Sequence, residues 1–337
     1  MDNVLVTGVT GQIGHYIAAL LAGRGVRVYG LVRQTTSQRH TPVAELPYIP
    51  VAGDLLDEFS MLSVLEELRP TRIFNFAAQS FIPSSWTQPI LTAQYTAMGV
   101  VRLLEAARRA VPHCRILQAG SSELFADSGV TPQDERTPIA PVNPYGIAKA
   151  FAYHTVLAYR RRYGVFATNA VFFTNESPRR SPDFIFRKVT RSVAEILAGK
   201  RKEFSIGNLD AVRDWGFAPE YAAIAVSLLE HDVADEFVVA TGEGHSVREL
   251  VQCACGLVGL DWERCVRVES GLVRPNEPAP PVGNTSKLKS QLGIHVNVTF
   301  ETLVRVMLAH DLQLQGLKPP FSTPALSPVL AQLTAAG

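Results

Sequence analysis

A glycine-rich loop near the beginning of the chain restricts the possible folds more than any other feature of the sequence. Gly8, Gly11 and Gly14 stand at a spacing of three and three. They join a strand-like run, residues 4–7, to a helical pattern of apolar residues that begins at Ile13. In a β-α-β unit, such glycines allow a tight turn, a close approach of the backbone to a pyrophosphate and close helix packing, with the phosphates at the positive helix N-terminus. The loop therefore predicts a dinucleotide-binding unit.

The first half of the chain alternates short β-branched runs with longer amphipathic segments. This alternation is typical of a parallel sheet covered by helices. We therefore expect an α/β fold with a doubly wound parallel sheet. The predicted strands are residues 4–7, 26–32, 48–51, 72–77, 115–119 and 166–173.

The second half of the chain predicts a smaller domain. After Phe173 the alternation gives way to a stretch rich in Pro, Arg and Asp, residues 177–183, and then to a helix near residues 189–198. We expect an α+β domain that closes over the carboxyl edge of the sheet, where open α/β folds bind ligands. The tail has four prolines and no acidic residue, which favours a loosely attached extension. The expected division is a sheet domain (1–173 and 211–240), a ligand-binding domain (174–210 and 241–316) and a flexible tail (317–337).

Composition narrows the possible partners. The formal net charge is +1, and the sequence has no block of like charges. The charge distribution therefore gives little support to nucleic acid or an anionic membrane as the main partner. No apolar run approaches the roughly 18 residues of a membrane span, and the first strand begins too early for a cleaved signal. We therefore expect a cytoplasmic protein with a small-molecule ligand. The four cysteines are too scattered for a zinc site, so no metal is expected, and Cys255 is predicted to lie in the core.

The sequence after the second strand bears on the choice of cofactor. No acidic side chain occurs between Asp2 and Glu45, where an NAD-binding protein usually places one for the ribose hydroxyls. Arg33 ends the second strand, and an arginine near hydroxyl side chains suits a 2′-phosphate, so NADP is expected. Alternatively, Arg33 is only a solvated residue at a strand end. Asp54 either contacts the adenine or caps the next helix. The residues that follow Arg33 include Gln34, Thr35, Thr36 and Arg39.

A tyrosine and a lysine carry the clearest catalytic signal. Tyr145 and Lys149 lie four residues apart, on one helical face, and Pro144 fits the helix start. An ammonium group beside a phenol favours the phenolate, which can take a proton from a hydroxyl as hydride leaves the same carbon. Ser121 and Ser122, at the end of the fifth strand, could bond the reacting oxygen. Glu123 beside them is either a surface residue or a base that removes a proton next to a ketone.

Together these residues resemble the extended short-chain dehydrogenase/reductase family and, within it, the GDP-mannose 4,6-dehydratases. The resemblance extends from about Val4 to Leu314. It rests on Thr10-Gly11-Gln12, Ala77-Ala78-Gln79-Ser80-Phe81, Ser85-Trp86, Ser121-Ser122-Glu123, Pro144-Tyr145-Gly146 with Lys149, Glu176-Ser177-Pro178-Arg179-Arg180, Phe186-Arg187-Lys188, Gly207-Asn208-Leu209-Asp210-Ala211, Arg213-Asp214-Trp215-Gly216 and Ala240-Thr241-Gly242-Glu243.

The resemblance implies a Rossmann-type sheet domain and an assignment of site residues. Ser121, Tyr145 and Lys149 would form the oxidising triad, and Glu123 would be the acid/base of the dehydration. NADP would be bound by Gly8, Gly11, Gln12, Ile13, Gly14, Arg33, Asp54, Leu55, Ala77, Tyr145 and Lys149. The substrate would be bound by Ser80, Ser85, Asn175, Lys188, Arg213, Arg274 and Glu277, with the last four on the GDP moiety. For Arg213, an ion pair with Asp214 or with another surface carboxylate is the alternative.

The implied activity is that of a lyase of nucleotide-sugar metabolism. It would convert GDP-mannose, or a close GDP-sugar, to the 4-keto-6-deoxy sugar by internal NADP-mediated hydride transfer. The implied assembly is a homodimer or a homotetramer. The alternative is an NADPH-dependent reductase or epimerase of a GDP-4-keto-6-deoxy sugar.

The chain departs from the family pattern at four places. The family reads Ser-Thr-Ser-Glu where this chain has Gly120-Ser121-Ser122-Glu123, and the form found here is similar to related reductases. The family reads Asn-His where this chain has Thr174-Asn175, which predicts a different fit to the sugar. Gln34 replaces an arginine, and Thr96 replaces an Asp or Asn.

Overall fold

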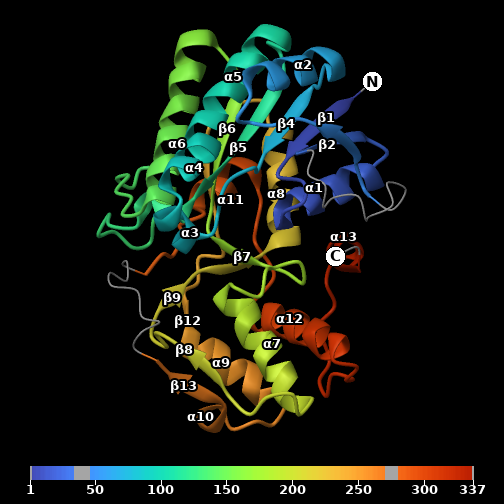
Figure 1. The fold of residues 1–337 in the computed structure, drawn as a ribbon, viewed down its shortest axis with the longest axis vertical. Helices are drawn as coiled ribbons and strands as arrows, with labels where there is room; N and C mark the ends of the chain where they lie inside the picture. Colours follow the sequence, from blue (N-terminus) through green and yellow to red (C-terminus); the bar gives the residue numbers. More distant parts are fainter. Residues whose placement is uncertain (1, 34–45, 270–279, 336–337) are drawn as a thin grey trace.

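The computed structural model describes residues 2–33, 46–269 and 280–335, and it shows a sheet domain above a smaller second domain (Figure 1). Within those residues, the sheet domain contains seven parallel strands in the order β11-β6-β5-β4-β1-β2-β3. The predicted α/β fold with a doubly wound parallel sheet is therefore confirmed. The strands are β1 (Asn3–Thr7), β2 (Arg27–Val32), β3 (Ile49–Ala52), β4 (Arg72–Asn75), β5 (Arg115–Ser121), β6 (Ala167–Phe172) and β11 (Glu236–Val239).

Helices cover both faces of the sheet because successive side chains of each strand point to opposite faces. On β1, Val4 and Val6 pack with α1 and α8, whereas Leu5 packs with α2, α5 and α6 on the other face. The apolar residues expected to line the first helix are all buried. The helices are α1 (Gln12–Gly23), α2 (Glu58–Leu68), α5 (Gly99–Ala110), α6 (Pro144–Tyr163) and α8 (Ala218–Glu230), with α11 (Ser286–Leu292) beside β11.

The strand order places the functional loops at one edge. β1 lies between β2 and β4, so the chain leaves the centre of the sheet in both directions from this point. Crevices at such switch points, beyond the carboxyl ends of the strands, are where open α/β sheets bind ligands. The glycine loop follows β1 at this edge. Short elements after β4 and β5 continue it: α3 (Ile82–Thr87), α4 (Pro89–Ala93), the π-helix η3 (Gln94–Met98) and the 3₁₀-helix η4 (Ser122–Phe125).

The second domain has a separate apolar core, with a buried ion pair between α7 and α12. The Arg187 guanidinium and the Asp311 carboxylate are both buried, with Nη2 and Oδ1 2.7 Å apart. Thr190 donates to the other oxygen of Asp311 at 2.7 Å, so both carboxylate oxygens are bonded. The domain contains α7 (Ile185–Leu197), α9 (Val247–Gly256), α10 (Trp262–Cys265), α12 (Phe300–Leu314) and the strand pairs β7–β10 (Thr174–Glu176, Trp215–Phe217), β8–β13 (Phe204–Ile206, Val266–Val268) and β9–β12 (Val212–Arg213, His245–Ser246).

The cores divide the chain differently from the expected ranges. Trp215 and Phe217 belong to the second-domain core, although residues 211–240 were assigned to the sheet domain. Leu288 belongs to the sheet-domain core, although 241–316 were assigned to the second domain. The expected boundaries follow changes of periodicity along the sequence. Inside the resulting ranges, however, nearby segments contribute side chains to different cores. Cys255 is buried in the second-domain core, as predicted.

The tail also differs from the loosely attached extension that its composition suggests. It contains α13 (Pro328–Ala335), which packs against α1 and α8. Leu330 is buried in the second-domain core and Leu333 in the sheet-domain core. Two leucines three residues apart are too few to form a recognisable periodic pattern, yet each is buried in one of the two cores. None of the helices in the described part of the chain is both long and apolar enough to cross a membrane.

Candidate active site

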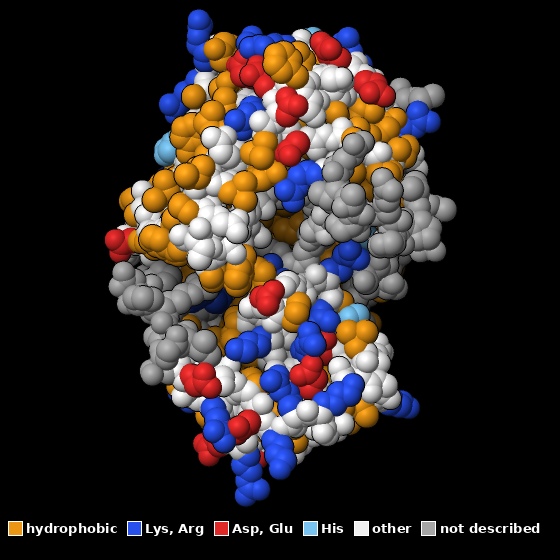
Figure 2. Space-filling model, in the orientation of Figure 1, with side chains coloured by type: hydrophobic (Ala, Val, Ile, Leu, Met, Phe, Trp, Pro, Cys, Tyr) orange, Lys and Arg blue, Asp and Glu red, His pale blue; other side chains and the backbone are white. Residues whose placement is uncertain are grey.

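A cavity of about 850 Å³ lies at the carboxyl edge of the sheet, and Figure 2 shows its opening between the two domains. Its volume is in the range of small-molecule sites. Its wall runs from the glycine loop, past the ends of β4 and β5 and the start of α6, to α7 and β9 of the second domain. The cavity is therefore long and joins the dinucleotide-type loop to the second domain.

The glycine loop has the geometry that its spacing predicts. Gly8 has a φ of +67°, and a side chain there would bring its Cβ within 2.6 Å of the backbone of Phe76. At Gly14 a Cβ would lie 2.4 Å from the carbonyl oxygen of Gly8. Gly11 is the N-cap of α1, and no side chain caps that helix. The first N–H groups of α1 therefore have no side-chain acceptor, which leaves the helix N-terminus suited to an anion.

At one end of the cavity, a chain of polar contacts connects β2 to η3. Arg33 donates from Nη1 to the hydroxyl of Tyr95 at 2.8 Å. The Tyr95 hydroxyl in turn lies 3.4 Å from Oδ2 of Asp54. Asp54 Oδ1 accepts from its own loop, at Leu56 N, so the helix-cap alternative for Asp54 is wrong. Asp57 is the residue that caps α2.

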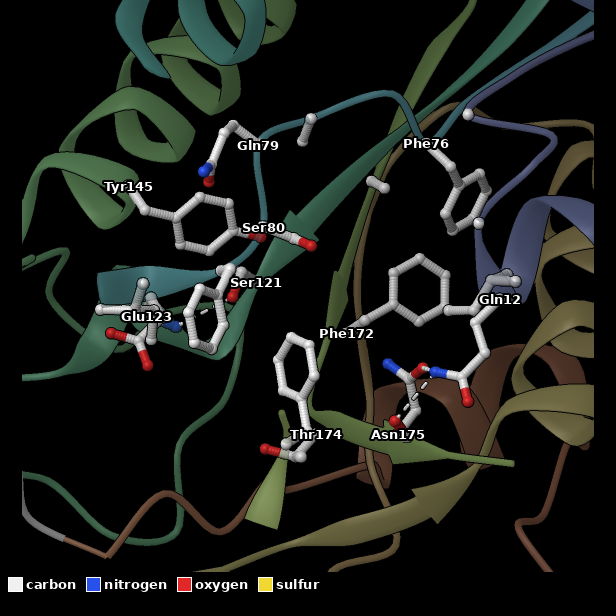
Figure 3. A pocket seen from close by; sticks show the side chains of 18 of the residues that line it. Gln12, Phe76, Gln79, Ser80, Ser121, Glu123, Tyr145, Phe172, Thr174 and Asn175 are labelled. Atoms are coloured by element: carbon white, nitrogen blue, oxygen red, sulfur yellow. Dashed lines mark hydrogen bonds between the residues drawn. The ribbon is translucent and has the colours of Figure 1, made fainter. Parts of the chain in front are cut away.

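The catalytic candidates meet near the middle of the cavity. Figure 3 shows the Tyr145 ring, Ser121 and Glu123 beside one another at the ends of α6 and β5. Burial raises the pKa of the Tyr145 phenol to about 12, and the Glu123 carboxylate adds to that rise. A hydrogen bond with Ser121 and the positive charge of Arg180 act in the opposite direction on the same pKa.

Lys149 lies near the Tyr145 ring and is also hydrogen-bonded to the neighbouring strand. Its Nζ donates to the carbonyl oxygen of Ala119 at 2.7 Å and lies 5.7 Å from the centre of the Tyr145 ring. Burial lowers the pKa of Lys149 from 10.5 to about 8. The ammonium group therefore lies between the carbonyl of β5 and the Tyr145 ring.

Glu123 is held from two sides. Its backbone N–H donates to Ser121 Oγ at 3.3 Å, which makes Ser121 the N-cap of η4. Its Oε2 accepts a hydrogen bond of 2.7 Å from Nδ2 of Asn143, the residue before α6. The carboxylate therefore lines the cavity in a fixed place and is not a free surface group.

The structure brings nearly all the predicted site residues to this one cavity. All the predicted cofactor residues line it, as do Ser80, Asn175, Lys188 and Arg213 among the predicted substrate residues. Arg274 and Glu277 lie outside the described residues, and so do Gln34, Thr35, Thr36, Arg39 and Glu45. The Asp214 carboxylate, one of the alternative partners of Arg213, accepts hydrogen bonds from the backbone N–H groups of Thr241, Gly242 and Gly283.

Ser85 does not reach the cavity, contrary to its predicted role in substrate binding. It is 0% exposed, and its hydroxyl donates to the carbonyl of Ile82 at 2.7 Å inside α3. Asn175 lines the cavity, but its Oδ1 accepts from Gln12 Nε2 at 3.1 Å (Figure 3). Its amide therefore bonds the glycine loop as well as facing the site.

Arg180 and Tyr95 line the cavity, although the sequence analysis assigned no role to either side chain. Arg180 lies 3.4 Å above the centre of the Phe184 ring, and its Nε is 3.2 Å from Oε2 of Glu176. Burial raises the pKa of Glu176 to about 7, and Arg180 opposes that rise. The motif that contains Arg180 was recognisable in the sequence. Tyr95 gave no signal, since it lies in a π-helix without periodic neighbours.

Comparison with known proteins supplies independent information. The family model described as GDP-mannose 4,6 dehydratase matches residues 5–307. The chain is 37% identical to GDP-mannose 4,6 dehydratase of Homo sapiens, over 94% of this chain and 92% of that protein. It is 34% identical to GDP-mannose 4,6-dehydratase of Yersinia enterocolitica, over 93% of this chain and 94% of that protein.

Solved structures show the same fold. dTDP-glucose 4,6-dehydratase from Bacillus anthracis, determined with NAD, superposes with a TM-score of 0.80 at 22% identity over 95% of this chain and 99% of that one. RMD from Pseudomonas aeruginosa, determined with NADPH, gives 0.78 at 21% identity over 93% and 99% of the two chains.

Burial of Lys149 leads to a prediction about stability. At neutral pH, Lys149→Met should stabilise the fold by about 1–3 kcal/mol, because a protonated ammonium is disfavoured in the folded state. The folded protein releases this proton as the pH rises through about 8, whereas the unfolded chain keeps it up to 10.5. The advantage should therefore be full below pH 8 and should shrink between these two values.

Urea unfolding of both proteins at several pH values measures this difference. Lys289→Met, the same change at an exposed lysine of α11, serves as the control. A Lys149→Met protein that is less stable than the wild type throughout would mean that the bond to Ala119 outweighs the burial of charge.

Proposed function

The chain belongs to the GDP-mannose 4,6-dehydratase family, and on that premise we propose that it is a nucleotide-sugar 4,6-dehydratase that acts on GDP-mannose or a close GDP-sugar, with NADP as cofactor. One observation carries most of the proposal. Tyr145, Ser121 and Glu123 line the middle of a single cavity that begins at the glycine loop and ends at the cationic side chains of the second domain. An oxidising group and an eliminating group therefore share one site.

The residues of the cavity fit a nicotinamide dinucleotide. The uncapped N-terminus of α1 and the glycines before it suit a pyrophosphate. The Arg33 guanidinium, at the end of β2, suits the 2′-phosphate that distinguishes NADP. A bound nicotinamide supplies the acceptor, and later the donor, of one hydride.

The chain's own residues carry the proton transfers. Tyr145 takes the proton of the 4-hydroxyl as C4 becomes a ketone, while the Ser121 hydroxyl bonds the same oxygen. The ketone acidifies C5, so Glu123 removes the C5 proton and delivers it to the 6-hydroxyl, which leaves as water. Return of the hydride to C6, and addition at C5 of the proton that Tyr145 took, would complete the 4-keto-6-deoxy sugar. Burial raises the Tyr145 pKa to about 12, and a positive charge placed beside the phenol would favour the phenolate.

Lys188 and Arg213 are proposed to bind the diphosphate of the substrate. Both line the end of the cavity in the second domain, one from α7 and one from β9. Cationic side chains on two different elements can hold both phosphate groups. The guanine is assigned to Arg274 and Glu277 by family resemblance alone.

Glu123→Gln separates dehydration from simple reduction. With GDP-mannose and NADP⁺, the variant should still oxidise C4, since Tyr145 is unchanged, but should eliminate water about 10²–10⁴-fold more slowly because its base is missing. Reduced nicotinamide should then accumulate on the enzyme without a dehydrated sugar. Absorbance of the nicotinamide and mass spectrometry of the sugar measure the two events.

Tyr145→Phe is the matched control, and it should carry out neither event. Wild-type protein should release the dehydrated sugar with no net change of NADPH. Stoichiometric use of NADPH on a 4-keto sugar, with no action on GDP-mannose, would identify a reductase or epimerase instead. Wild-type rates in Glu123→Gln would remove Glu123 from the mechanism.

Arg33→Ala tests the choice of cofactor. The variant should bind NADPH more weakly by about 1.5–3 kcal/mol, because a charge-assisted hydrogen bond to the 2′-phosphate is lost. Affinity for NADH should change little. Calorimetric titration with both cofactors measures this, and Arg24→Ala, which removes an exposed arginine of the same domain, is the control. Equal losses for NADPH and NADH would contradict the assignment.

We also propose that two copies of the chain associate through an apolar face on α3, α4 and α6. Trp86 and Ile90 are 63% and 78% exposed, and Ile147 and Phe151 are exposed one turn apart on α6. These helices are in contact with one another, and Figure 2 shows orange side chains gathered over this part of the sheet domain. Apolar patches of this kind are rare on monomers, and a two-fold axis would bury the same patch on both copies.

Light scattering tests this association. The wild type should have at least twice the chain mass of 36.8 kDa, and Phe151→Asp should have the mass of one chain, since burying a lone carboxylate in an apolar interface is unfavourable. Phe59→Asp, at an exposed phenylalanine of α2, should not change the mass. A wild-type protein of single-chain mass would contradict the proposal.

A further inference from the structure

Asn143 occupies an unusual place at the start of α6. It is buried and does not itself line the cavity. Its Oδ1 accepts from the backbone N–H of Gly146 at 2.8 Å, which makes it the N-cap of the helix. Its Nδ2 donates to Oε2 of Glu123 at 2.7 Å. Both ends of one amide group are therefore engaged, one by the helix and one by the carboxylate.

The two bonds determine the orientation of the amide. A backbone N–H can only donate, so the amide oxygen must face Gly146, and the NH₂ group must then face Glu123. An aspartate or a serine could cap the helix equally well, but neither presents an amide N–H at this place. A donor in this position is needed for the carboxylate and not for the helix.

The backbone around the pair is packed closely enough to keep this geometry. A Cβ at Gly146 would lie 2.9 Å from the carbonyl oxygen of Glu123 and 3.0 Å from Cβ of Pro141. The first turn of α6 therefore lies directly against η4. Tyr145 belongs to that same turn, two residues after Asn143. A movement of the start of α6 would therefore shift both Tyr145 and Glu123.

We infer that Asn143 is a positioning residue for the elimination step, which fixes Oε2 of Glu123 and directs the carboxylate at the substrate beside Tyr145. This inference rests on the proposed function, because it concerns Glu123 as the eliminating base. The pKa of Tyr145 is lowered by Ser121, which belongs to β5 and does not depend on the Asn143 amide. The loss of the Asn143 amide should therefore disturb elimination and leave oxidation at C4 nearly unchanged.

Asn143→Ser is the decisive variant, because serine keeps the helix cap and removes the amide donor. A displacement of about 1 Å in a reacting group can lower a rate about 10²-fold, so we expect elimination to slow by about 10- to 100-fold. Reduced nicotinamide should appear at nearly the wild-type rate in a single turnover and then persist. The KM for the GDP-sugar and the thermal midpoint should remain close to those of the wild type.

Two further variants separate positioning from structure. Asn143→Ala removes the cap as well as the donor and should lower the thermal midpoint in addition to the elimination rate. Thr299→Ala removes the N-cap of α12 in the second domain and should leave the ratio of the two rates unchanged. Elimination at the wild-type rate in Asn143→Ser would overturn the inference, and so would an equal loss of both steps.

The proposed function can fail separately from this inference. If Glu123→Gln eliminates water normally, the role of Glu123 is wrong, whatever Asn143→Ser does. If Glu123→Gln is blocked while Asn143→Ser is normal, Glu123 keeps its role and Asn143 is only a helix cap.

Discussion

The close approach of the loop after β1 to the chain after β4 determines the position of the whole site. Gly8 has no side chain and a positive φ, so its Cα can lie against the backbone of Phe76. This contact keeps β1 and β4 adjacent at the point where the strand order reverses, and it directs the N-terminus of α1 into the cavity. Gly14 then allows α1 to return close to Gly8. A larger residue at either glycine would move the helix that forms the cofactor end of the site.

Burial of ionisable groups is the second constraint on the site. Lys149 and Tyr145 are both in the core, and in each case burial shifts the pKa toward the neutral form. Glu176, at the other side of the cavity, has its pKa raised to about 7 for the same reason. Buried groups of this kind respond strongly to a charge brought by a ligand, since desolvation strengthens electrostatic interactions. This arrangement costs stability and favours chemistry that begins only when the ligand is present.

Much of the fold could be predicted from local pattern, because alternation and glycine spacing depend on neighbours in the sequence. The six predicted strands all form, with ends that shift by one or two residues. No strand was predicted at β11, which is short and lies within the range assigned to the sheet domain. The packing of Leu330 and Leu333 depends on two cores contributed by distant parts of the chain, which no local pattern reveals.

Sequence motifs were enough to locate many residues of the candidate site. They were not enough where the role of a residue depends on the direction of its side chain. The motifs located Tyr145, Ser121 and Glu123, which share the cavity. The Ser85-Trp86 motif could not show that Ser85 points into its own helix toward the Ile82 carbonyl. Lys149 lies at the expected spacing, but its partner is a strand carbonyl that sequence spacing cannot identify.

Asn175, which departs from the family pattern, also takes part in the contact between the two domains. Gln12, next to the N-cap of α1, donates to both the backbone carbonyl and Oδ1 of Asn175 (Figure 3). It also accepts from Ser177 Oγ at 2.5 Å. These bonds tie the glycine loop to β7, the first strand of the second domain. The amide of Gln12 is thus engaged by the protein on both its oxygen and its nitrogen. A change at position 175 therefore affects the placement of the cofactor loop as well as the fit of the sugar, because the same side chain belongs to both.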